Sequence, residues 1–173
     1  MGYFGVKEND DMFGKSNQIQ RNYFVSARYN IFAIVLFSAI NVAMCLLGMD
    51  SYFLFSAIVP YFVASIGAYW GGLYAPEFYV DSGMTEADFM STGFVVACAA
   101  VAIVIIALYL VCGLLCKKHV AFMIAALALF VIDTIMMPVL YDISLEWILD
   151  YVFHAWVLIS LTAGVVYHFR HRA

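Results

Sequence analysis

Charged side chains are scarce in this sequence, and their scarcity excludes an ordinary soluble fold. Asp, Glu, Lys and Arg make up 12% of the 173 residues, whereas hydrophobic residues make up 66%. Soluble domains carry a charge on about a quarter of their residues, and a chain of this length has too little interior to bury so much apolar surface. Together with a mean hydropathy of +0.95, this composition predicts an integral membrane protein in contact with membrane lipid.

Several functional motifs are also absent. The net charge of −4 offers no basic stripe, so we expect no nucleic-acid partner. The sequence contains no Gly-x-Ser-x-Gly, His-Glu-x-x-His or Cys-x-x-Cys motif. We therefore assign no catalytic residue and no cofactor, and the sequence favours a protein that is not an enzyme. An intramembrane lipid-modifying enzyme that uses paired aspartates is the least favoured alternative.

The few cysteines do not predict a disulfide framework or a metal centre. All four lie within or at the edge of apolar runs, where we expect them to be small buried hydrophobic residues. Cys112, Cys116 and His119 lie near one helix end. A structural zinc site needs four ligands and a two-residue spacing between cysteines, so we predict no metal site.

Long apolar runs predict an all-α integral membrane protein, a bundle of about five transmembrane helices, with four or six as alternatives. A polar tail or interfacial helix precedes the bundle, and a basic tail follows it. The predicted segments are 1–29 for the N-terminal tail or interfacial helix, 30–167 for the bundle with spans near 30–47, 52–74, 93–116, 120–140 and 145–167, and 168–173 for the C-terminal tail.

Pro60 interrupts the second predicted span. Aromatic residues at both ends, such as Tyr52 and Trp70, favour a complete crossing of the membrane. A proline removes one helical hydrogen bond and should kink this span unless neighbouring groups satisfy the freed carbonyl. The alternative is a re-entrant loop at Phe53–Pro60.

The distribution of Lys and Arg predicts an orientation. With five spans the two termini lie on opposite sides of the membrane. Close to the membrane, Arg21 and Arg28 precede the first span, whereas the other side carries four basic residues: Lys117, Lys118, Arg170 and Arg172. Including the more distant Lys7 and Lys15 makes the two totals equal. Positive charge favours the cytoplasm, so we expect a multi-pass protein of the plasma membrane with its N-terminus outside and its C-terminus inside.

Three ionisable side chains interrupt the last two spans. Asp133 precedes the turn between these spans by about as many residues as Asp150 follows it, and His154 lies one helical turn beyond Asp150. Glu146 continues the same helix face toward the turn. An acidic group at the centre of a transmembrane helix costs about 3 kcal/mol, so this cluster requires an explanation.

Sharing a proton would reduce that cost. We expect either a proton shared between Asp133 and Asp150, or an ion pair between Asp150 and a protonated His154. Such a pair predicts a proton- or cation-handling site, with the two aspartates as carriers and His154 as a relay. The alternative is a buried polar cluster that only holds the two helices together.

The sequence therefore predicts a proton- or cation-coupled transporter, or a channel component, for a small solute. Asp133, Asp150, His154 and Glu146 are the predicted proton, cation or ligand site. The residues predicted to line its cavity are Asn41, Pro60, Tyr61 and Trp70, although ordinary packing would also explain them. The alternative function is a non-catalytic membrane subunit. Because five helices leave little room for a water-filled path in one monomer, both hypotheses favour a homo-oligomer or a subunit of a larger membrane complex.

Overall fold

The computed structural model describes residues 4–49, 51–141 and 147–170, and every regular element among them is helical. Two short 3-10 turns, η1 (Pro76–Tyr79) and η2 (Glu86–Asp88), lie in the loop that precedes the third long helix. The long helices are α1 (Phe4–Leu46), α2 (Ile58–Trp70), α3 (Thr92–Leu115), α4 (Val120–Leu140) and α5 (Ile148–Arg170). The predicted all-α bundle of about five helices is confirmed.

Among the described residues, four segments are long and apolar enough to cross a membrane: Asn22–Leu46, Thr92–Leu115, Val120–Leu140 and Ile148–Phe169. The remaining helix, α2, has only 13 residues. At 1.5 Å per residue it is about 20 Å long, which is too short for a hydrocarbon core of about 30 Å. The protein is therefore a multi-pass membrane protein with four candidate spans and one shorter apolar helix.

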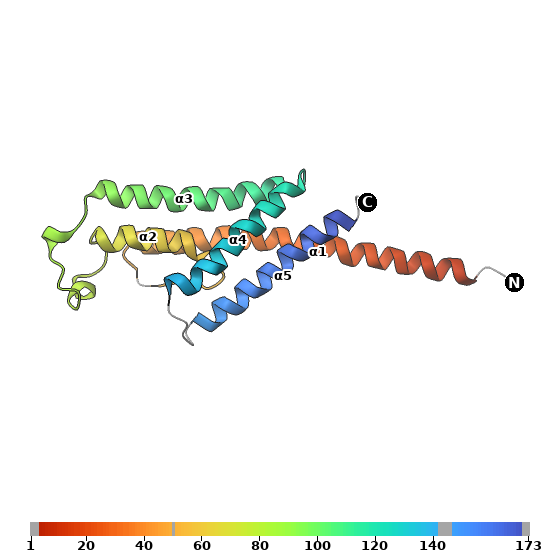
Figure 1. Cartoon of the computed structure of the whole chain (residues 1–173), viewed down its shortest axis with the longest axis horizontal. Helices are drawn as coiled ribbons and strands as arrows, with labels where there is room; N and C mark the ends of the chain where they lie inside the picture. Colours follow the sequence, from red (N-terminus) through yellow and green to blue (C-terminus); the bar gives the residue numbers. More distant parts are fainter. Residues whose placement is uncertain (1–3, 50, 142–146, 171–173) are drawn as a thin grey trace.

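The first helix begins earlier than the predicted start of the span at Asn30. It extends without interruption from Phe4 to Leu46, and its N-terminal part projects beyond the other helices (Figure 1). Residues 4–46 contain no proline, so no helix-breaking residue separates the polar part from the apolar part.

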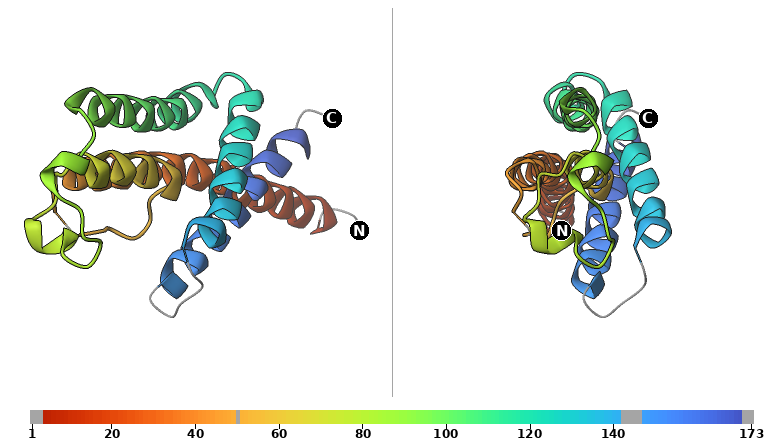
Figure 2. Two further views of the ribbon diagram at one scale, coloured as in Figure 1. Left: turned by 60° about the vertical axis from the view of Figure 1, so that its left-hand side comes forward. Right: turned by 90° about the vertical axis from the view of Figure 1, so that its left-hand side faces the viewer.

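The second helix begins later than predicted, at Ile58 instead of Tyr52. Pro60 occupies the third position of α2, where a helix does not need the missing N–H, so it does not kink the helix. The preceding chain turns back along α1, and α2 then extends in the same direction as α1 (Figures 1 and 2). This arrangement corresponds to the re-entrant alternative.

A consequence is that the two ends of the chain lie on the same side of the bundle. The start of α1 and the end of α5 lie toward the same end as the short link between α3 and α4 (Figure 1). The prediction that the termini lie on opposite sides is therefore wrong. The chain after α1 enters the bundle, and α2 leads it back to the end at which α1 finished, so this segment adds no crossing and the number of crossings is even.

The helices surround α2 on three sides. It packs against α1, α3 and α4, and α5 packs against α1 and α4. The contact with α3 is close: a Cβ added at Gly67 would lie 2.7 Å from the Cβ of Cys98. These contacts hold the N-terminal end of α2 inside the protein, near the middle of α4 and α5.

All four cysteines are free thiols.

Candidate functional site

Three predicted site residues meet where α4, α5 and the start of α2 come together. Asp133, Asp150 and His154 are 2%, 0% and 0% exposed. The Nε2 atom of His154 lies 3.1 Å from Oδ2 of Asp133. The predicted pairing therefore needs a correction: the partner of Asp133 is His154 and not Asp150. Antiparallel packing of α4 and α5 brings the deeper residue of α5 level with the aspartate of α4.

Asp133 also caps helix α2 from a different helix. The backbone N–H of Ile58 donates to its Oδ2, and that of Val59 donates to its Oδ1, both at 2.9 Å. A helix N-terminus needs acceptors for its first N–H groups, and Ala57 at the N-cap position has no side-chain acceptor. The carboxylate from α4 supplies them, and the positive end of the helix dipole favours a negative charge at this point.

The other backbone donors at the start of α2 are also accounted for. Ala57 donates its N–H to Oγ of Ser38 at 2.8 Å, and Pro60 has no N–H to donate. In a membrane interior, where water is scarce, each unsatisfied N–H costs several kcal/mol. The polar side chains of α1 and α4 thus permit a helix to begin inside the bundle.

The chain before α2 is held by Asn41 of α1, which is fully buried. Its Oδ1 accepts the N–H of Phe53 at 2.7 Å, and its Nδ2 donates to the carbonyl of Phe53 and to Oγ of Ser56, both at 2.8 Å. Ser56 in turn donates to the hydroxyl of Tyr52 at 3.0 Å. An amide with a donor and an acceptor can replace the backbone partners that a non-helical segment lacks, so Asn41 fixes the path of the re-entrant chain.

The tautomer of His154 follows from its two contacts. Its Nδ1 lies 2.8 Å from the backbone carbonyl oxygen of Asp150, which can only accept, so Nδ1 carries a hydrogen. Nε2 then either donates to an Asp133 carboxylate as part of an imidazolium, or accepts from a protonated Asp133. In both forms a single proton lies in the contact between His154 and Asp133.

The ring of His154 is enclosed by aromatic side chains. It stacks on Phe130 with a centroid distance of 4.8 Å and an interplanar angle of 14°. Phe153 contacts it edge-on at 5.9 Å. These contacts fix the plane of the imidazole, so that Nε2 stays directed at Asp133.

Asp150 is the least satisfied member of the cluster. Neither carboxyl oxygen receives a hydrogen bond of good geometry from the described residues, although the hydroxyl of Tyr52 and the backbone N–H of Phe55 face them. Phe55 has φ of +74°, a left-handed conformation that is unfavourable for a bulky residue. This strained residue lies in the re-entrant chain, and its ring packs edge-on against Phe153 at 4.6 Å.

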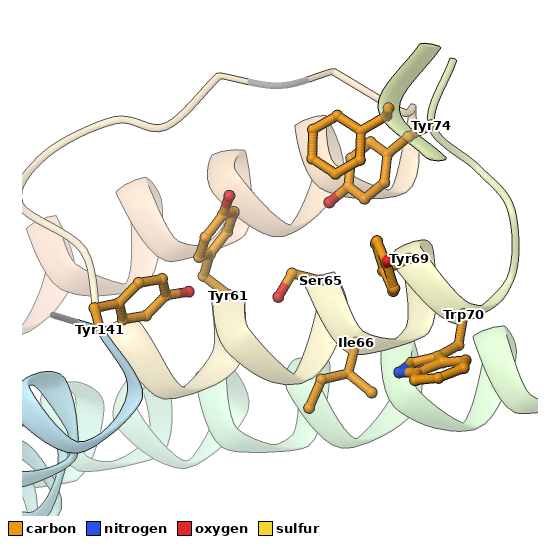
Figure 3. A pocket seen from close by; sticks show the side chains of 8 residues that line it. Tyr61, Ser65, Ile66, Tyr69, Trp70, Tyr74 and Tyr141 are labelled. Atoms are coloured by element: carbon orange, nitrogen blue, oxygen red, sulfur yellow. The ribbon is translucent and has the colours of Figure 1, made fainter. Parts of the chain in front are cut away.

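A cavity of about 300 Å³ lies beside α2, toward the loop that joins α2 to α3. Of the four residues predicted to line a cavity, Tyr61 and Trp70 do so. The rings of Tyr61, Tyr69, Tyr74 and Tyr141 gather around Ser65 (Figure 3). Pro60 and Asn41 instead serve the start of α2 and the chain before it. The lining residues are Tyr61, Ser65, Ile66, Tyr69, Trp70, Tyr74, Phe78 and Tyr141.

Some of the polar network was not assigned a role from the sequence, and one predicted residue lies outside the described part of the chain. Ser38 and Ser56 were not predicted as site residues, yet both are buried and hydrogen-bonded. Ser38 and Asn41 are three residues apart on one helix face, and this spacing could have indicated that Ser38 belongs to the same polar network.

Glu146 lies outside the described residues, as does Asp142. Within the described residues, no three His, Cys, Asp or Glu side chains lie close enough together to hold a metal ion.

We compared the chain with models of known protein families, with curated proteins and with solved structures, and none of these matches it.

Proposed function

We propose that this protein is a proton-coupled membrane transport protein for a small solute. The observation that carries the proposal is the buried contact between His154 and Asp133, 3.1 Å long, at the N-terminus of a helix that begins inside the bundle. Ionisable groups inside a membrane protein are costly and are commonly part of ion or proton pathways. This pair holds one exchangeable proton in a position where its charge acts directly on a helix end.

A proton suits the site better than a metal cation. Both oxygens of Asp133 already accept a backbone N–H, and Nδ1 of His154 is occupied by the carbonyl of Asp150. Hard cations such as Ca²⁺ require six or more oxygen ligands, which this contact does not offer. A proton needs only the donor and the acceptor that are present.

The proton is coupled to the solute through α2. Protonation of Asp133 removes the negative charge that faces the N-terminus of α2 and weakens its hydrogen bonds to Ile58 and Val59. The same helix carries Tyr61, Ser65, Tyr69 and Trp70 into the aromatic cavity. A shift of α2 that follows loss of this cap changes the shape of the cavity, which we propose as the solute site.

Asp150 provides the next proton position. It is fully buried and lies one helical turn from His154, to which its backbone carbonyl is bonded. Neither of its carboxyl oxygens has a hydrogen-bond partner of good geometry among the described residues. We propose that protons pass between Asp150 and the pair of Asp133 and His154.

The distribution of charge supports an orientation with both termini in the cytoplasm. Seven of the eight Lys and Arg residues lie in described segments, all at the end shared by the two termini: Lys7, Lys15, Arg21, Arg28, Lys117, Lys118 and Arg170. The connections at the opposite end contain no Lys or Arg but do contain Glu77, Asp81, Glu86 and Asp88. The positive-inside rule therefore favours the basic end as the cytoplasmic one. This orientation replaces the N-terminus-out prediction that depended on five spans.

We further propose the plasma membrane as the location and association with a second copy or another membrane subunit as the working state. Most of α3 faces outward, because the residues of α3 that are buried are few: Ala102, Ile106, Tyr109, Cys112 and Gly113. An outward apolar helix suits contact with either lipid or another helix, and cross-linking in native membranes distinguishes the two.

Proton flux into liposomes tests the proposal. The purified protein is reconstituted with a pH-sensitive dye inside the vesicles, and a valinomycin-induced potassium potential drives proton entry. We expect flux with the native sequence and at least a tenfold loss in Asp133→Asn and in His154→Gln. The control is Asp88→Asn, the same chemical change at an exposed carboxylate of the α2–α3 loop.

A purely structural role for the cluster predicts a different outcome. The variant His154→Gln leaves the Asp133 carboxylate in place as the cap of α2, so it tests the proton path with the fold intact. Unchanged proton flux in folded His154→Gln would falsify the proposed transport role. A subunit without transport activity of its own would show no flux even with the native sequence.

Movement of α2 is tested separately by fluorescence. In a protein with Trp147→Phe and Trp156→Phe, Trp70 is the single tryptophan, and it reports on the cavity. We expect its emission to change as protons bind, and to become independent of pH when Asp133→Asn is added. A pH response that survives Asp133→Asn contradicts coupling through the cap.

A further inference from the structure

A second cavity, of about 210 Å³, lies at the basic end of the bundle and shares no lining residue with the aromatic cavity. Its lining consists of Phe24, Val25, Arg28 and Tyr29 from α1, and Lys117 from the link between α3 and α4. It thus brings two cations from different elements to one hollow, and none of the described residues that line it is acidic. The inference below does not depend on the proposed transport function.

Arg28 is the anchor of this hollow. Its Nε donates to the backbone carbonyl of Gly113 at 2.9 Å, which ties the guanidinium to the C-terminal end of α3. Its Cζ lies 5.0 Å from the centroid of the Phe32 ring. A guanidinium has five N–H donors. One is used for Gly113, and the side chain also forms a hydrogen bond with the Cys116 thiol, which leaves further donors for a ligand.

Within the described part of the chain, the charge of Arg28 has no carboxylate partner. Among the described side chains the only contact between a basic group and a carboxylate is that of His154 with Asp133. Arg28 is half-buried between aromatic and aliphatic groups, and a charge in such surroundings is costly unless it is paired. Lys117, which is exposed, adds a second positive charge beside it. The hollow is therefore complementary to an anion.

The position of the hollow indicates which anion. It lies near the start of the membrane span Asn22–Leu46 and at the end of α3, where lipid headgroups meet the protein. Guanidinium groups bind phosphate through two parallel hydrogen bonds, and basic pockets between helices on the cytoplasmic side suit lipid phosphates. Tyr29 is 67% exposed and offers the aromatic contact typical of this depth.

We propose that this hollow binds the phosphate group of an anionic phospholipid. Arg28 holds two phosphate oxygens, Lys117 neutralises the remaining charge, and Phe24 and Val25 supply apolar contacts at the wall of the hollow. Inorganic phosphate has the same charged group as the phospholipid but lacks its acyl chains. Only the phospholipid can therefore gain affinity from the apolar contacts.

Lipid-dependent thermal stability tests the proposal with the full chain in mild detergent. The unfolding temperature is titrated with phosphatidylglycerol, with phosphatidylcholine and with inorganic phosphate, because a ligand that binds only the folded state raises it, and a tighter ligand raises it more at the same concentration. We expect phosphatidylglycerol to raise the unfolding temperature, with little effect of phosphatidylcholine or of inorganic phosphate at the same concentration. Equal shifts from both lipids, or a full shift from phosphate alone, overturn the assignment to an anionic lipid.

A matched pair of lysine variants locates the site. Lys117→Gln removes a cation from the lining, whereas Lys118→Gln removes an adjacent exposed cation that does not line it. We expect Lys117→Gln to weaken the apparent affinity for phosphatidylglycerol about fivefold, the effect of one basic group near an anionic headgroup, and Lys118→Gln to weaken it less than twofold. Equal losses in the two variants indicate general attraction of charge and refute a defined site.

Arg28→Gln and Arg28→Lys complete the series. Gln cannot provide the charge, and Lys provides it without the two-pronged geometry. We expect Arg28→Gln to abolish the stabilisation and Arg28→Lys to retain only part of it. If Arg28→Gln does not fold, because its bond to Gly113 is lost, the comparison of Lys117→Gln with Lys118→Gln still decides the proposal.

Discussion

Helices α2 and α3 lie side by side and are both strongly apolar, but they begin in very different surroundings. α3 begins at Thr92, next to exposed residues of the acidic loop, and its 24 residues contain no charge. α2 begins at Ile58, which is fully buried. Water can satisfy the first N–H groups of α3, whereas those of α2 need acceptors supplied by Asp133 and Ser38. Asp133 and Ser38 are therefore needed inside the bundle because α2 begins there.

The comparison also separates a structural role from a functional one. A cap for α2 requires only hydrogen-bond acceptors, which a neutral amide or hydroxyl also provides, as Ser38 does for Ala57. The cap that Asp133 provides is instead an ionisable group, and it contacts a histidine at 3.1 Å. The proposed proton coupling rests on this difference, because the start of α3 has no side-chain cap.

The largest effect should come from removing the charged cap of α2. Asp133→Leu removes both acceptors and leaves His154 without its partner, so we expect a loss of about 3–5 kcal/mol in the free energy of unfolding. Asp133→Asn keeps one carbonyl acceptor and should lose less. Unfolding in mixed detergent micelles measures both variants. A stability of Asp133→Leu equal to that of the native protein would show that α2 does not depend on this cap.

The next effect concerns the chain that leads into α2. Asn41→Leu removes three hydrogen bonds and leaves the N–H and carbonyl of Phe53 unsatisfied, at a cost of about 2–3 kcal/mol. The matched control is Asn30→Leu on the same helix, because the buried Nδ2 of Asn30 has no hydrogen-bond partner among the described residues. We expect the control to be neutral or stabilising. Equal losses in both variants would contradict the role of Asn41.

A smaller effect is expected where α2 and α3 touch. Gly67→Ala places a methyl group 2.7 Å from the Cβ of Cys98, so the helices must separate, at a cost of about 1–3 kcal/mol. Adding Cys98→Gly removes the opposing carbon and should restore part of the stability. The same change at Gly93, which has only the Ser91 hydroxyl within contact distance at 3.6 Å, serves as the control.

The smallest effect concerns the water-exposed turn before α3. The N–H and hydroxyl of Thr85 donate to Asp88 Oδ2 at 2.9 and 2.8 Å, and these bonds lower the pKa of Asp88 from its usual value of 3.8. Because the pKa is depressed in the folded protein, the stabilisation of this turn is complete above pH 3.8 and is lost as the pH falls through the folded value.

The pH dependence of the Thr85 amide resonance measures this prediction. We expect the resonance to move below pH 3.8 in the native protein and to be independent of pH in Asp88→Asn. Since the turn lies in water, the global stability of the protein should change little. A large loss of global stability in Asp88→Asn would show that the bundle depends on this turn.

The candidate site could be found from the sequence, but its pairing could not. A charge within a long apolar run is visible in composition alone, so Asp133, Asp150 and His154 were identified as the unusual residues. Equal spacing from the turn favoured Asp150 as the partner of Asp133. The packing of α5 against α4 instead selects His154, because partner choice depends on the relative rotation and shift of the two helices, which spacing does not determine.

The path of α2 shows the same division. Its apolar length and aromatic ends predicted a complete crossing from 52 to 74, and only the position of Pro60 pointed to a re-entrant loop. The acceptors that allow the helix to begin at Ile58 come from Ser38, 20 residues earlier, and Asp133, 75 residues later. No local pattern contains that information.

The sequence by itself determined that this chain is a helical membrane protein, because hydropathy over about 20 residues decides whether a segment prefers lipid. It also determined which ionisable groups enter the bundle. Only the tertiary structure decided that α2 stops short of a crossing, that both ends of the chain lie on one side, and that Asp133 joins a helix end to a histidine. Those outcomes depend on hydrogen bonds between distant residues, and such bonds exist only after the helices have packed.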